Sequence, residues 1–387
     1  MESAYVYLGV ALVSLLVVLA CRRRSAAHGC DGLRLAPGPW QLPVIGSLHH
    51  LAGQLPHRAM RDLARRHGPV MFLRLGEVPT LVVSSREGAS EVMKTHDTTF
   101  ATRPLSATIR VLTNGGRDMA FAPYGDYWRQ LRKIAVMELF TARRVLSFRA
   151  IREEESRPHF RLDMDAVKSV IFDIFGAGSE TSTTTLEWAI AELIKNPKVM
   201  HKATAEVRRV FEARGAVAEH ALGELPYFHL VIRETLRLHT PVPLLLPREC
   251  QEPCQVLGYN VPRGTQVLVN AWALGRDERY WPDAPEEFRP ERFEGGAAAV
   301  EFRGTDFSFL PFGAGRRMCP GMAFGLANVE LALASLLFHF DWEVPPAAEF
   351  DMSETFGLTA RPKAKLLLRP VLRVPIVGVL STGKGDR

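Results

Sequence analysis

The sequence predicts a mainly α-helical fold with a small β component and a membrane anchor at the N-terminus. Several long segments repeat apolar residues at the i, i+3, i+4, i+7 spacing of helices, whereas only short runs alternate as strands do. An uncharged run, Tyr5–Ala20, is followed by three consecutive arginines at 22–24. Because 47% of the 387 residues are apolar and 23% are charged, the chain can bury a large globular core.

The composition excludes several classes of protein. Five cysteines are too few for a disulfide scaffold. Cys250 and Cys254 have a C-x3-C spacing, but no second ligand pair lies nearby, so we expect them to be structural rather than zinc ligands. The net charge of +6 comes with no nucleic-acid-binding motif, which indicates a solvated basic surface and no nucleic-acid partner.

Residues 1–24 are predicted to form the membrane anchor. The 16 residues from Tyr5 to Ala20 reach ~24 Å as a helix, and Cys21 with snorkelling arginines would extend this towards the ~30 Å of a bilayer core. A cleaved signal peptide would carry its positive charge before the apolar run, but here the charge follows it. The positive-inside rule therefore places the rest of the chain in the cytosol.

A proline-rich stretch at 25–46 is expected to form a stiff hinge between the anchor and the folded part. The pattern then predicts a helix, two strands joined by a turn at Gly76–Pro79, and two further helices: His57–His67, Val70–Leu75, Thr80–Ser84, Glu87–His96 and Tyr124–Leu139.

A long central helix is predicted between a capping Asp163 or Asp165 and Pro197. Its interior contains Gly176 and Gly178, and each glycine costs ~1 kcal/mol in a helix. A helix that tolerates both is expected to approach another group closely at that point. Two helices, a strand pair, a loop region and a buried apolar helix are expected after it: Lys198–Arg214, Leu225–His239, Val256–Asn270 around Pro262–Gly264, Glu291–Phe309 and Met322–Phe338.

The segment Phe312–Gly321 carries the strongest chemical signal. Cys319 directly precedes a proline, which favours the first turn of a helix, so its thiol is expected at a helix N-terminus that favours the thiolate. Gly313 and Gly315 permit a tight turn against a flat ligand, and Arg317 adds positive charge. These features are typical of a haem-iron ligand, although a lone cysteine is more often a buried structural residue. A dinucleotide loop fits less well because the third glycine is missing.

Four motifs, each in its expected order, resemble those of the cytochromes P-450. The haem-binding signature of the family is matched at Phe312, Gly315, Arg317, Cys319 and Gly321. Glu234–Arg237 resembles the ExxR element, Pro290–Phe293 the PERF element, and Ala177–Thr181 the oxygen-activation segment of the long central helix. The hinge and the style of the motifs are most similar to plant microsomal members, which implies a location in the endoplasmic reticulum membrane.

The resemblance implies roles for individual residues. Cys319 would be the proximal thiolate ligand of haem b and would favour O–O cleavage. Glu180 and Thr181 would supply protons for oxygen activation; from the residues alone, the Thr181 hydroxyl could instead bond back to its own helical turn. A W-x-x-x-R pair and two further arginines would hold the haem propionates: Trp128, Arg132, Arg248 and Arg317.

A buried charge triad is implied for Glu234, Arg237 and Arg292. The alternative for the first two is a surface i,i+3 pair worth ~0.2–0.5 kcal/mol. Apolar walls of a substrate pocket, or alternatively ordinary core, are expected from Phe121, Phe175, Ala177, Val242, Leu244 and Phe356.

The chain departs from the family between two of these motifs. In the family, five helices separate the tryptophan helix from the central helix, and they need at least ~75 residues. Here Trp128 and Thr181 are only 53 positions apart, and about 25 of these positions are free for additional helices. We therefore expect 47–387 to be a cytochrome P-450 domain that lacks about five helices, with the seam near 156–162. Such a loss would expose an apolar face and open the haem pocket to water.

The resemblance implies a membrane-bound monooxygenase. It would insert one oxygen atom from O2 into an apolar small molecule such as a terpenoid, with electrons from an NADPH-dependent reductase attracted by Lys133 and Arg316. Two alternatives stay open: a truncated product that does not catalyse and binds haem poorly, and a haem-thiolate isomerase or dehydratase of hydroperoxides. Glu180 and Thr181 argue against the second alternative, since such an enzyme needs no protonation of dioxygen.

Overall fold

The computed structural model describes residues 34–139, 163–294, 304–345, 350–357 and 359–375, together with the single positions 9, 13 and 14. Apart from those single positions, the expected anchor at 1–24 lies outside the described residues, and so does the expected seam near 156–162. Two compact units make up the chain. The smaller unit contains Met1–Pro104 and Pro247–Asn270, and the larger unit contains Leu105–Leu246 and Ala271–Arg387.

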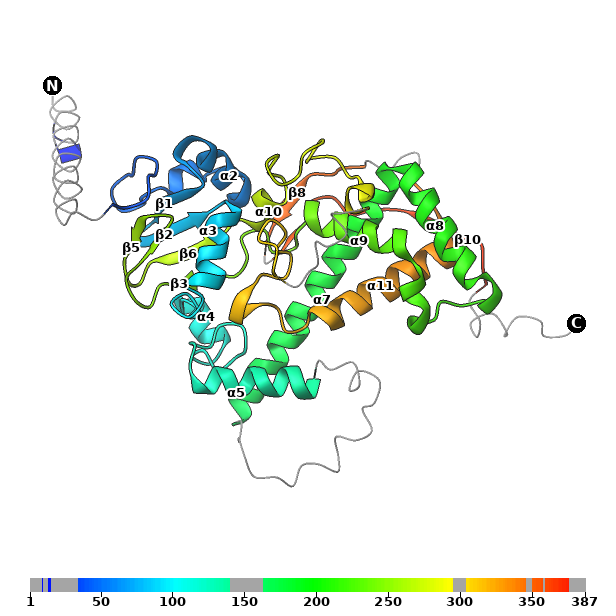
Figure 1. The fold of residues 1–387 in the computed structure, drawn as a ribbon, viewed down its shortest axis with the longest axis horizontal. Helices are drawn as coiled ribbons and strands as arrows, with labels where there is room; N and C mark the ends of the chain where they lie inside the picture. Colours follow the sequence, from blue (N-terminus) through cyan, green and yellow to red (C-terminus); the bar gives the residue numbers. More distant parts are fainter. Residues whose placement is uncertain are drawn as a thin grey trace, which may run out of the picture. The chain divides into compact units, whose positions relative to one another are not determined.

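A four-stranded sheet organises the smaller unit (Figure 1). Its strands, in spatial order, are β1 (Val70–Leu75), β2 (Val78–Val83), β6 (Gln266–Val269) and β3 (Arg248–Glu249). The β1–β2 and β3–β6 pairs are antiparallel, whereas β2 and β6 are parallel. The two strands predicted at Val70–Leu75 and Thr80–Ser84 therefore form, but the turn is shorter than the predicted Gly76–Pro79, because β2 already begins at Val78.

The strand pair predicted at 256–270 is wrong. Tyr259–Val261 (β5) pairs with Cys254–Val256 (β4), whereas β6 joins the four-stranded sheet beside β2. The two runs that flank Pro262–Gly264 therefore belong to different sheets. An alternating apolar pattern identifies a strand and its buried face, but it does not specify which strand lies beside it.

Helical segments of the smaller unit follow the predicted order. They are η1 (Leu48–His50), α2 (Pro56–His67), α3 (Arg86–Ser90) and the π-helical turn η2 (Glu91–Thr95). Ser85 caps α3, because its hydroxyl accepts a hydrogen bond from Gly88 N at 3.2 Å. The helix predicted at Glu87–His96 is thus an α-helical turn that continues with π geometry.

The larger unit is mainly helical, as predicted. Its α-helices are α4 (Ala107–Leu112), α5 (Asp126–Ile134), α7 (Met164–Lys195), α8 (Pro197–Phe211), α9 (Pro226–Leu238), α10 (Ala271–Leu274) and α11 (Met322–His339). Short helical turns are η3 (Ala135–Leu139), η4 (Glu212–Arg214), η5 (Glu219–Glu224), η6 (Pro290–Phe293) and η8 (Gly315–Arg317). Two small sheets pair β7 (Phe340–Glu343) with β10 (Arg369–Leu372) and β8 (Glu354–Phe356) with β9 (Ala360–Pro362).

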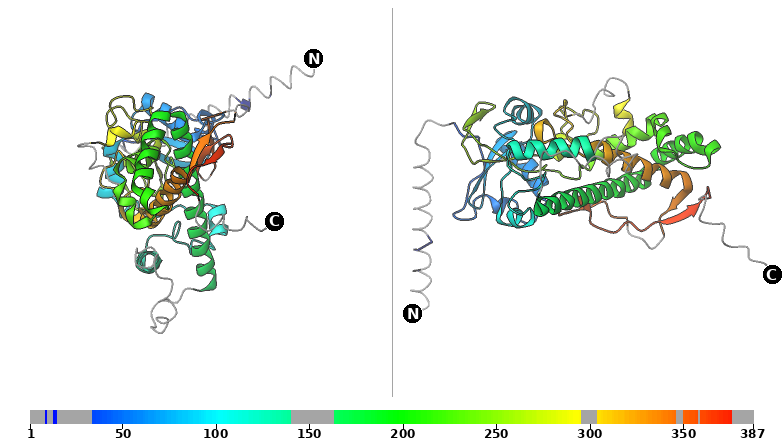
Figure 2. Two further views of the ribbon diagram at one scale, coloured as in Figure 1. Left: turned by 90° about the vertical axis from the view of Figure 1, so that its right-hand side faces the viewer. Right: turned by 90° about the horizontal axis from the view of Figure 1, so that it is seen from below.

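The central helix α7 runs without interruption for 32 residues, through both interior glycines (Figure 2). Asp163 is its cap: the carboxylate accepts a hydrogen bond from Ala166 N at 2.8 Å, which satisfies one of the free amides of the first turn. Of the two aspartates proposed as caps from the sequence, Asp163 takes the role.

The main core of the larger unit lies between the C-terminal half of α7, α8, α9 and α11. Large side chains that fill it include Phe211, Phe228, Phe293 and Phe338, all at most 1% exposed. The prediction that α11 is buried holds for one face only, which carries residues such as Val329 and Leu337. Among the described residues, α11 is the one helix long and apolar enough to span a membrane, but its buried face packs on α7 and α8.

Candidate functional site

The loop before α11 folds back on itself so that it presents Cys319. The Cys319 amide donates a hydrogen bond to Phe312 O at 2.9 Å, which closes the turn. Gly313 and Gly315 both have φ of +69°, in the left-handed region that a side chain disfavours. Cys319 is exposed, and α11 begins three residues later at Met322. The glycines thus let the loop place the thiol two residues before Gly321, the N-cap of α11, so Pro320 precedes the helix and does not lie in its first turn as the sequence predicted.

The Cys319 thiol does not have the lowered pKa that the sequence predicted. The residue is exposed, yet its thiol lies among enough neighbouring atoms for burial to raise its pKa above the ordinary value. A hydrogen bond with the Gly321 backbone and the positive charge of Arg132 act in the opposite direction and are smaller. The prediction was wrong because it counted the helix terminus and nearby charge but omitted desolvation. A metal ion at the sulfur would supply the missing positive charge, because coordination deprotonates a thiol.

Two arginines lie against Trp128 beside this loop. The guanidinium carbon of Arg317 is 4.2 Å from the indole centroid, and that of Arg132 is 5.5 Å away. Arg132 Nη2 donates to Met318 O at 2.5 Å, and Arg317 Nη2 donates to Ala122 O at 2.5 Å. The larger unit therefore brings the W-x-x-x-R pair of α5 together with the cysteine loop.

Arg248 has a different environment. It lies on β3 in the smaller unit, where it is 3% exposed and its Nη1 is 3.5 Å from Asp97 Oδ1. Burial lowers the pKa of Arg248, and the charge of Asp97 opposes this shift. The described contacts therefore give Arg248 a partner within its own unit.

The two glycines of α7 face open space. A Cβ atom built at Gly176 or Gly178 would meet nothing within 4 Å, so no described residue makes the close approach expected there. The Thr181 hydroxyl donates to Ala177 O at 2.6 Å, which is the bond to its own turn considered from the sequence. One residue further, Ser182 Oγ lies 4.0 Å from a Cβ built at Gly325 of α11, so this part of α7 lies next to the helix that follows Cys319.

Thr359 is a site residue that the sequence did not reveal. Its hydroxyl donates to Glu180 Oε1 at 2.9 Å and lies 3.2 Å from Thr184 Oγ1. Thr359 is fully buried, close to the small β8–β9 sheet. No spacing rule connects it with α7, because the two segments meet only after the chain has folded.

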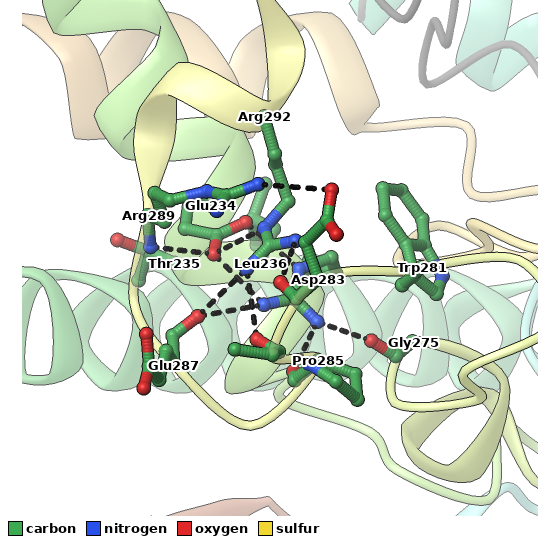
Figure 3. Close-up of polar contacts among 12 residues, drawn as sticks. Glu234, Thr235, Leu236, Gly275, Trp281, Asp283, Pro285, Glu287, Arg289 and Arg292 are labelled. Carbon is green, nitrogen blue, oxygen red and sulfur yellow. Dashed lines mark hydrogen bonds and ion pairs between the residues drawn. The ribbon is translucent and has the colours of Figure 1, made fainter.

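Glu234, Arg237 and Arg292 come together in the larger unit. Figure 3 shows Glu234 and Arg292 of this group. The Glu234 carboxylate accepts two hydrogen bonds from Arg237 and one from Arg292 Nε, each at 2.8 Å. Both side chains of the Glu234–Arg237 pair are 0% exposed, and that of Arg292 is 5% exposed. Backbone carbonyls, including Gly275 O and Pro285 O, accept further bonds from Arg237. The buried arrangement is therefore realised, and the surface-pair alternative is not.

The expected pocket residues have varied environments. Leu244 is buried, Phe121 and Val242 are half-buried, and Ala177 and Phe175 are exposed. Phe175 is 74% exposed and lines an open hollow of about 330 Å³ that also contains Glu180. Phe356 is part of β8.

The donor set fits a haem better than a metal held by protein ligands. Among the described residues, no group of three or more histidine, cysteine, aspartate or glutamate side chains could hold a metal ion. A metal at Cys319 must therefore bring most of its ligands with it, as porphyrin iron does. Haem propionates require cations; Arg132 lies against the loop that carries the thiol, and Arg317 belongs to that loop.

Comparison with known proteins extends this picture. The family model described as "Cytochrome P450" matches residues 36–162 and 158–369. The chain is 41% identical to desmethyl-deoxy-podophyllotoxin synthase of Sinopodophyllum hexandrum over 489 aligned positions, which cover 93% of this chain and 96% of the relative. It is 40% identical to dolabradiene monooxygenase of Zea mays, over 95% of this chain and 98% of the relative.

A solved structure shares the fold. A zebra fish cytochrome P450, determined with abiraterone, superposes with a TM-score of 0.71, at 24% identity, over 82% of this chain and 100% of that chain. The match of the family model to most of the residues, together with relatives at 40–41% identity, shows that this chain belongs to the cytochrome P-450 family of haem monooxygenases.

Proposed function

We propose that the chain is a haem-thiolate monooxygenase that hydroxylates an apolar small molecule of the terpenoid class. The observation that carries the proposal is the glycine loop that presents the Cys319 thiol beside Arg132, Arg317 and Trp128. The substrate class is supported by relatives whose names specify diene substrates, dolabradiene monooxygenase and amorpha-4,11-diene 12-monooxygenase of Artemisia annua.

Each part of the loop has a role in holding the cofactor. Cys319 Sγ would hold the iron of haem b, and the two arginines beside Trp128 would bind its propionates. We assign Phe312, Gly315 and Gly321 to the turn that keeps the backbone close to the porphyrin. When bound, the haem supplies the activation of O2 and the transfer of one oxygen atom.

Protons for this reaction are proposed to come through Glu180. Its Oε1 accepts the hydroxyl proton of Thr359, which in turn is within hydrogen-bonding distance of Thr184. Thr181 adds a second hydroxyl on the same helix, one residue further along. The hollow beside Glu180 is open to solvent and therefore offers a path by which protons can be replaced.

The partner and location follow from the same family. We propose electron supply by an NADPH-dependent reductase that contacts the exposed basic side chains Lys133 and Arg316. We propose an anchor at 1–24, a hinge at 25–46 and a cytosolic haem domain at 47–387, held at the endoplasmic reticulum membrane.

A second candidate is a shortened product that lacks activity. The N-terminal half of α7 exposes Ile171 (60%), Phe172 (56%) and Phe175 (74%), which is an apolar face that a folded monomer normally covers. The family model matches in two stretches that meet at 158–162. The alignment with desmethyl-deoxy-podophyllotoxin synthase has 489 positions but contains 93% of this chain, which is about 360 of its 387 residues. About 130 aligned positions of that relative therefore have no counterpart in this chain. These observations support the loss of about five helices near 156–162.

A reduced-plus-CO difference spectrum of the purified full chain distinguishes the two candidates. The monooxygenase proposal expects a red-shifted Soret band that Cys319→Ser abolishes and Cys254→Ser, in the smaller unit, leaves unchanged. A band typical of a neutral ligand, or no haem at all, would favour the inactive product. NADPH consumption that depends on both reductase and substrate then separates a monooxygenase from a hydroperoxide isomerase, which consumes none.

A further inference from the structure

Two cysteines of the smaller unit lie side by side. Cys250 directly follows β3, and Cys254 is the first residue of β4. Their sulfur atoms are 4.0 Å apart. A disulfide bond joins sulfurs ~2.0 Å apart, so bonding requires the two sulfurs to approach each other by about 2 Å.

The surroundings of the two thiols differ. Cys250 is 0% exposed, whereas Cys254 is partly exposed. The backbone on both sides of Cys250 is fixed, because its amide donates to Thr265 O at 2.9 Å and its carbonyl accepts from Gly264 N at 2.7 Å. One thiol is thus held inside the unit while the other can be reached from solvent.

Hydrogen bonding makes the two thiols unequal in acidity. Cys250 Sγ can donate its single proton to Cys254 Sγ, to Glu252 O at 3.0 Å, or to Val261 O at 3.7 Å. Donation to Cys254 raises the pKa of Cys250 and lowers the pKa of Cys254, although burial and, to a smaller extent, the carboxylate of Glu91 oppose the second effect. Cys254 is therefore the sulfur that more readily becomes the nucleophilic thiolate.

We propose that Cys250 and Cys254 form a reversible two-electron redox site that responds to hydrogen peroxide. The Cys254 thiolate attacks the peroxide, breaks its O–O bond and becomes a sulfenic acid, while hydroxide leaves. The Cys250 sulfur, after losing its proton, then attacks the Cys254 sulfur; the S–S bond forms and the sulfenic oxygen leaves as water. The dithiol has lost two electrons and two protons, and the peroxide has been reduced to water. A monothiol or dithiol reductant reverses the change.

The product links the end of β3 to the start of β4. β3 is an edge strand of the four-stranded sheet, and β4 pairs with β5 in a separate hairpin. In the reduced form the backbone of Gln251–Pro253, the weak thiol contact and the contact of Cys250 Sγ with Val261 O connect the two elements. The disulfide would therefore fix this hairpin to the sheet edge without involving the cysteine of the larger unit.

The test uses the full-length chain, treated with hydrogen peroxide and then alkylated after denaturation. Both cysteines lie in one tryptic peptide, Glu249–Arg263. The expected result is a peptide that is two hydrogens lighter and unalkylated, and that regains two alkyl groups after reduction with dithiothreitol. A peptide that remains fully alkylatable, or that carries sulfinic acid instead of the disulfide, overturns the proposal.

Two variants assign the roles of the two sulfurs. In Cys250→Ser, the Cys254 sulfenic acid has no resolving thiol and should be trapped by dimedone, whereas Cys254→Ser should leave Cys250 unreactive towards peroxide. Without peroxide, iodoacetamide should alkylate Cys254 in the folded wild-type chain at least about tenfold faster than Cys250. Faster labelling of Cys250, or no dimedone adduct in Cys250→Ser, contradicts the assignment. Each readout is independent of haem content and of monooxygenase activity.

Discussion

Replacement of Glu234 by glutamine is expected to destabilise the larger unit by about 3–5 kcal/mol. The Glu234 side chain is 0% exposed, and its two oxygens accept four hydrogen bonds of 2.8 Å. Two come from Arg237, one from Arg292 Nε and one from the Arg289 amide. Glutamine keeps the shape of the side chain but removes its charge and replaces one accepting oxygen with a donating NH2 group.

The magnitude follows from these contacts. One lost charge-assisted hydrogen bond accounts for about 1.5–3 kcal/mol. Arg237 and Arg292 then stay buried without their counter-charge, which brings the total to the ~3–5 kcal/mol typical of a broken buried pair. Carbonyl groups such as Gly275 O continue to bond Arg237 and limit the loss. Since folded domains are stable by only about 5–15 kcal/mol, the variant loses a large fraction of its stability.

Urea unfolding of the full chain, followed by far-UV circular dichroism, measures the effect. Glu224→Gln is the matched control, because that side chain is 59% exposed and its ion pair with Arg214 is 3.5 Å long. A surface pair of this kind contributes about 0–1 kcal/mol. If the free energies of unfolding of the two variants differed by less than about 0.5 kcal/mol, the triad would not be the stabilising centre that its burial indicates.

Three further outcomes are expected. Burial and the charge of Asp173 raise the pKa of Asp118 to about 7, from 3.8 in its ordinary environment. A carboxyl that binds its proton more tightly in the folded state stabilises the fold below its unfolded pKa, and this contribution is lost as the pH rises towards 7. Asp118→Asn should therefore remove a decline in stability between about pH 4 and pH 7, measured by urea unfolding at several pH values. Phe211→Ala should lower the free energy of unfolding by about 3–5 kcal/mol, because Phe211 is 0% exposed in the main core. Phe175→Ser should change it by no more than about 0.5 kcal/mol, because that ring is 74% exposed.

Each of these expectations has a contrary outcome. Parallel stability–pH curves for wild type and Asp118→Asn would mean that Asp118 does not titrate in this range. A small effect of Phe211→Ala would indicate that the core between α8 and α11 can collapse around the gap. A large loss in Phe175→Ser would mean that its ring is covered in solution, by another copy of the chain or by a segment outside the described residues.

Helix positions were predictable because helical periodicity is a local property. Both ends of α7 could be located from nearby residues alone: the capping Asp163 marks its start, the periodic apolar residues follow, and Pro197 marks its end. The hairpin of β1 and β2 was predictable for the same reason, but the partner of β6 was not, because Gln266–Val269 pairs with Thr80–Val83, which lies far away in the chain. The nearest neighbour in sequence was the natural expectation for a partner, and it was wrong for this reason.

In the candidate site, too, local features could be predicted from the sequence and contacts between distant segments could not. Glu234 and Arg237 share one helical turn, and the cysteine loop is a single segment, so motif spacing was enough to identify both. The contact of Thr359 with Glu180 joins residues 179 positions apart, and nothing local indicates it. The pKa of Cys319 was misjudged for a related reason, since desolvation depends on every segment that packs around the thiol.

The main core and the exposed apolar face of α7 lie at different distances from the expected seam. The buried cluster of the main core lies between Ala189 and Phe338, entirely on the C-terminal side of 156–162. The triad and the cysteine loop also lie on that side, so the expected shortening would leave intact the core on which they pack. By contrast, the exposed apolar side chains of α7 begin directly after the seam, at Met164, and extend to Phe175. A loss of helices there would remove the cover of the proposed substrate pocket and would leave the cysteine loop on its core. Shortening should therefore weaken the selection and retention of substrate before it weakens the binding of haem.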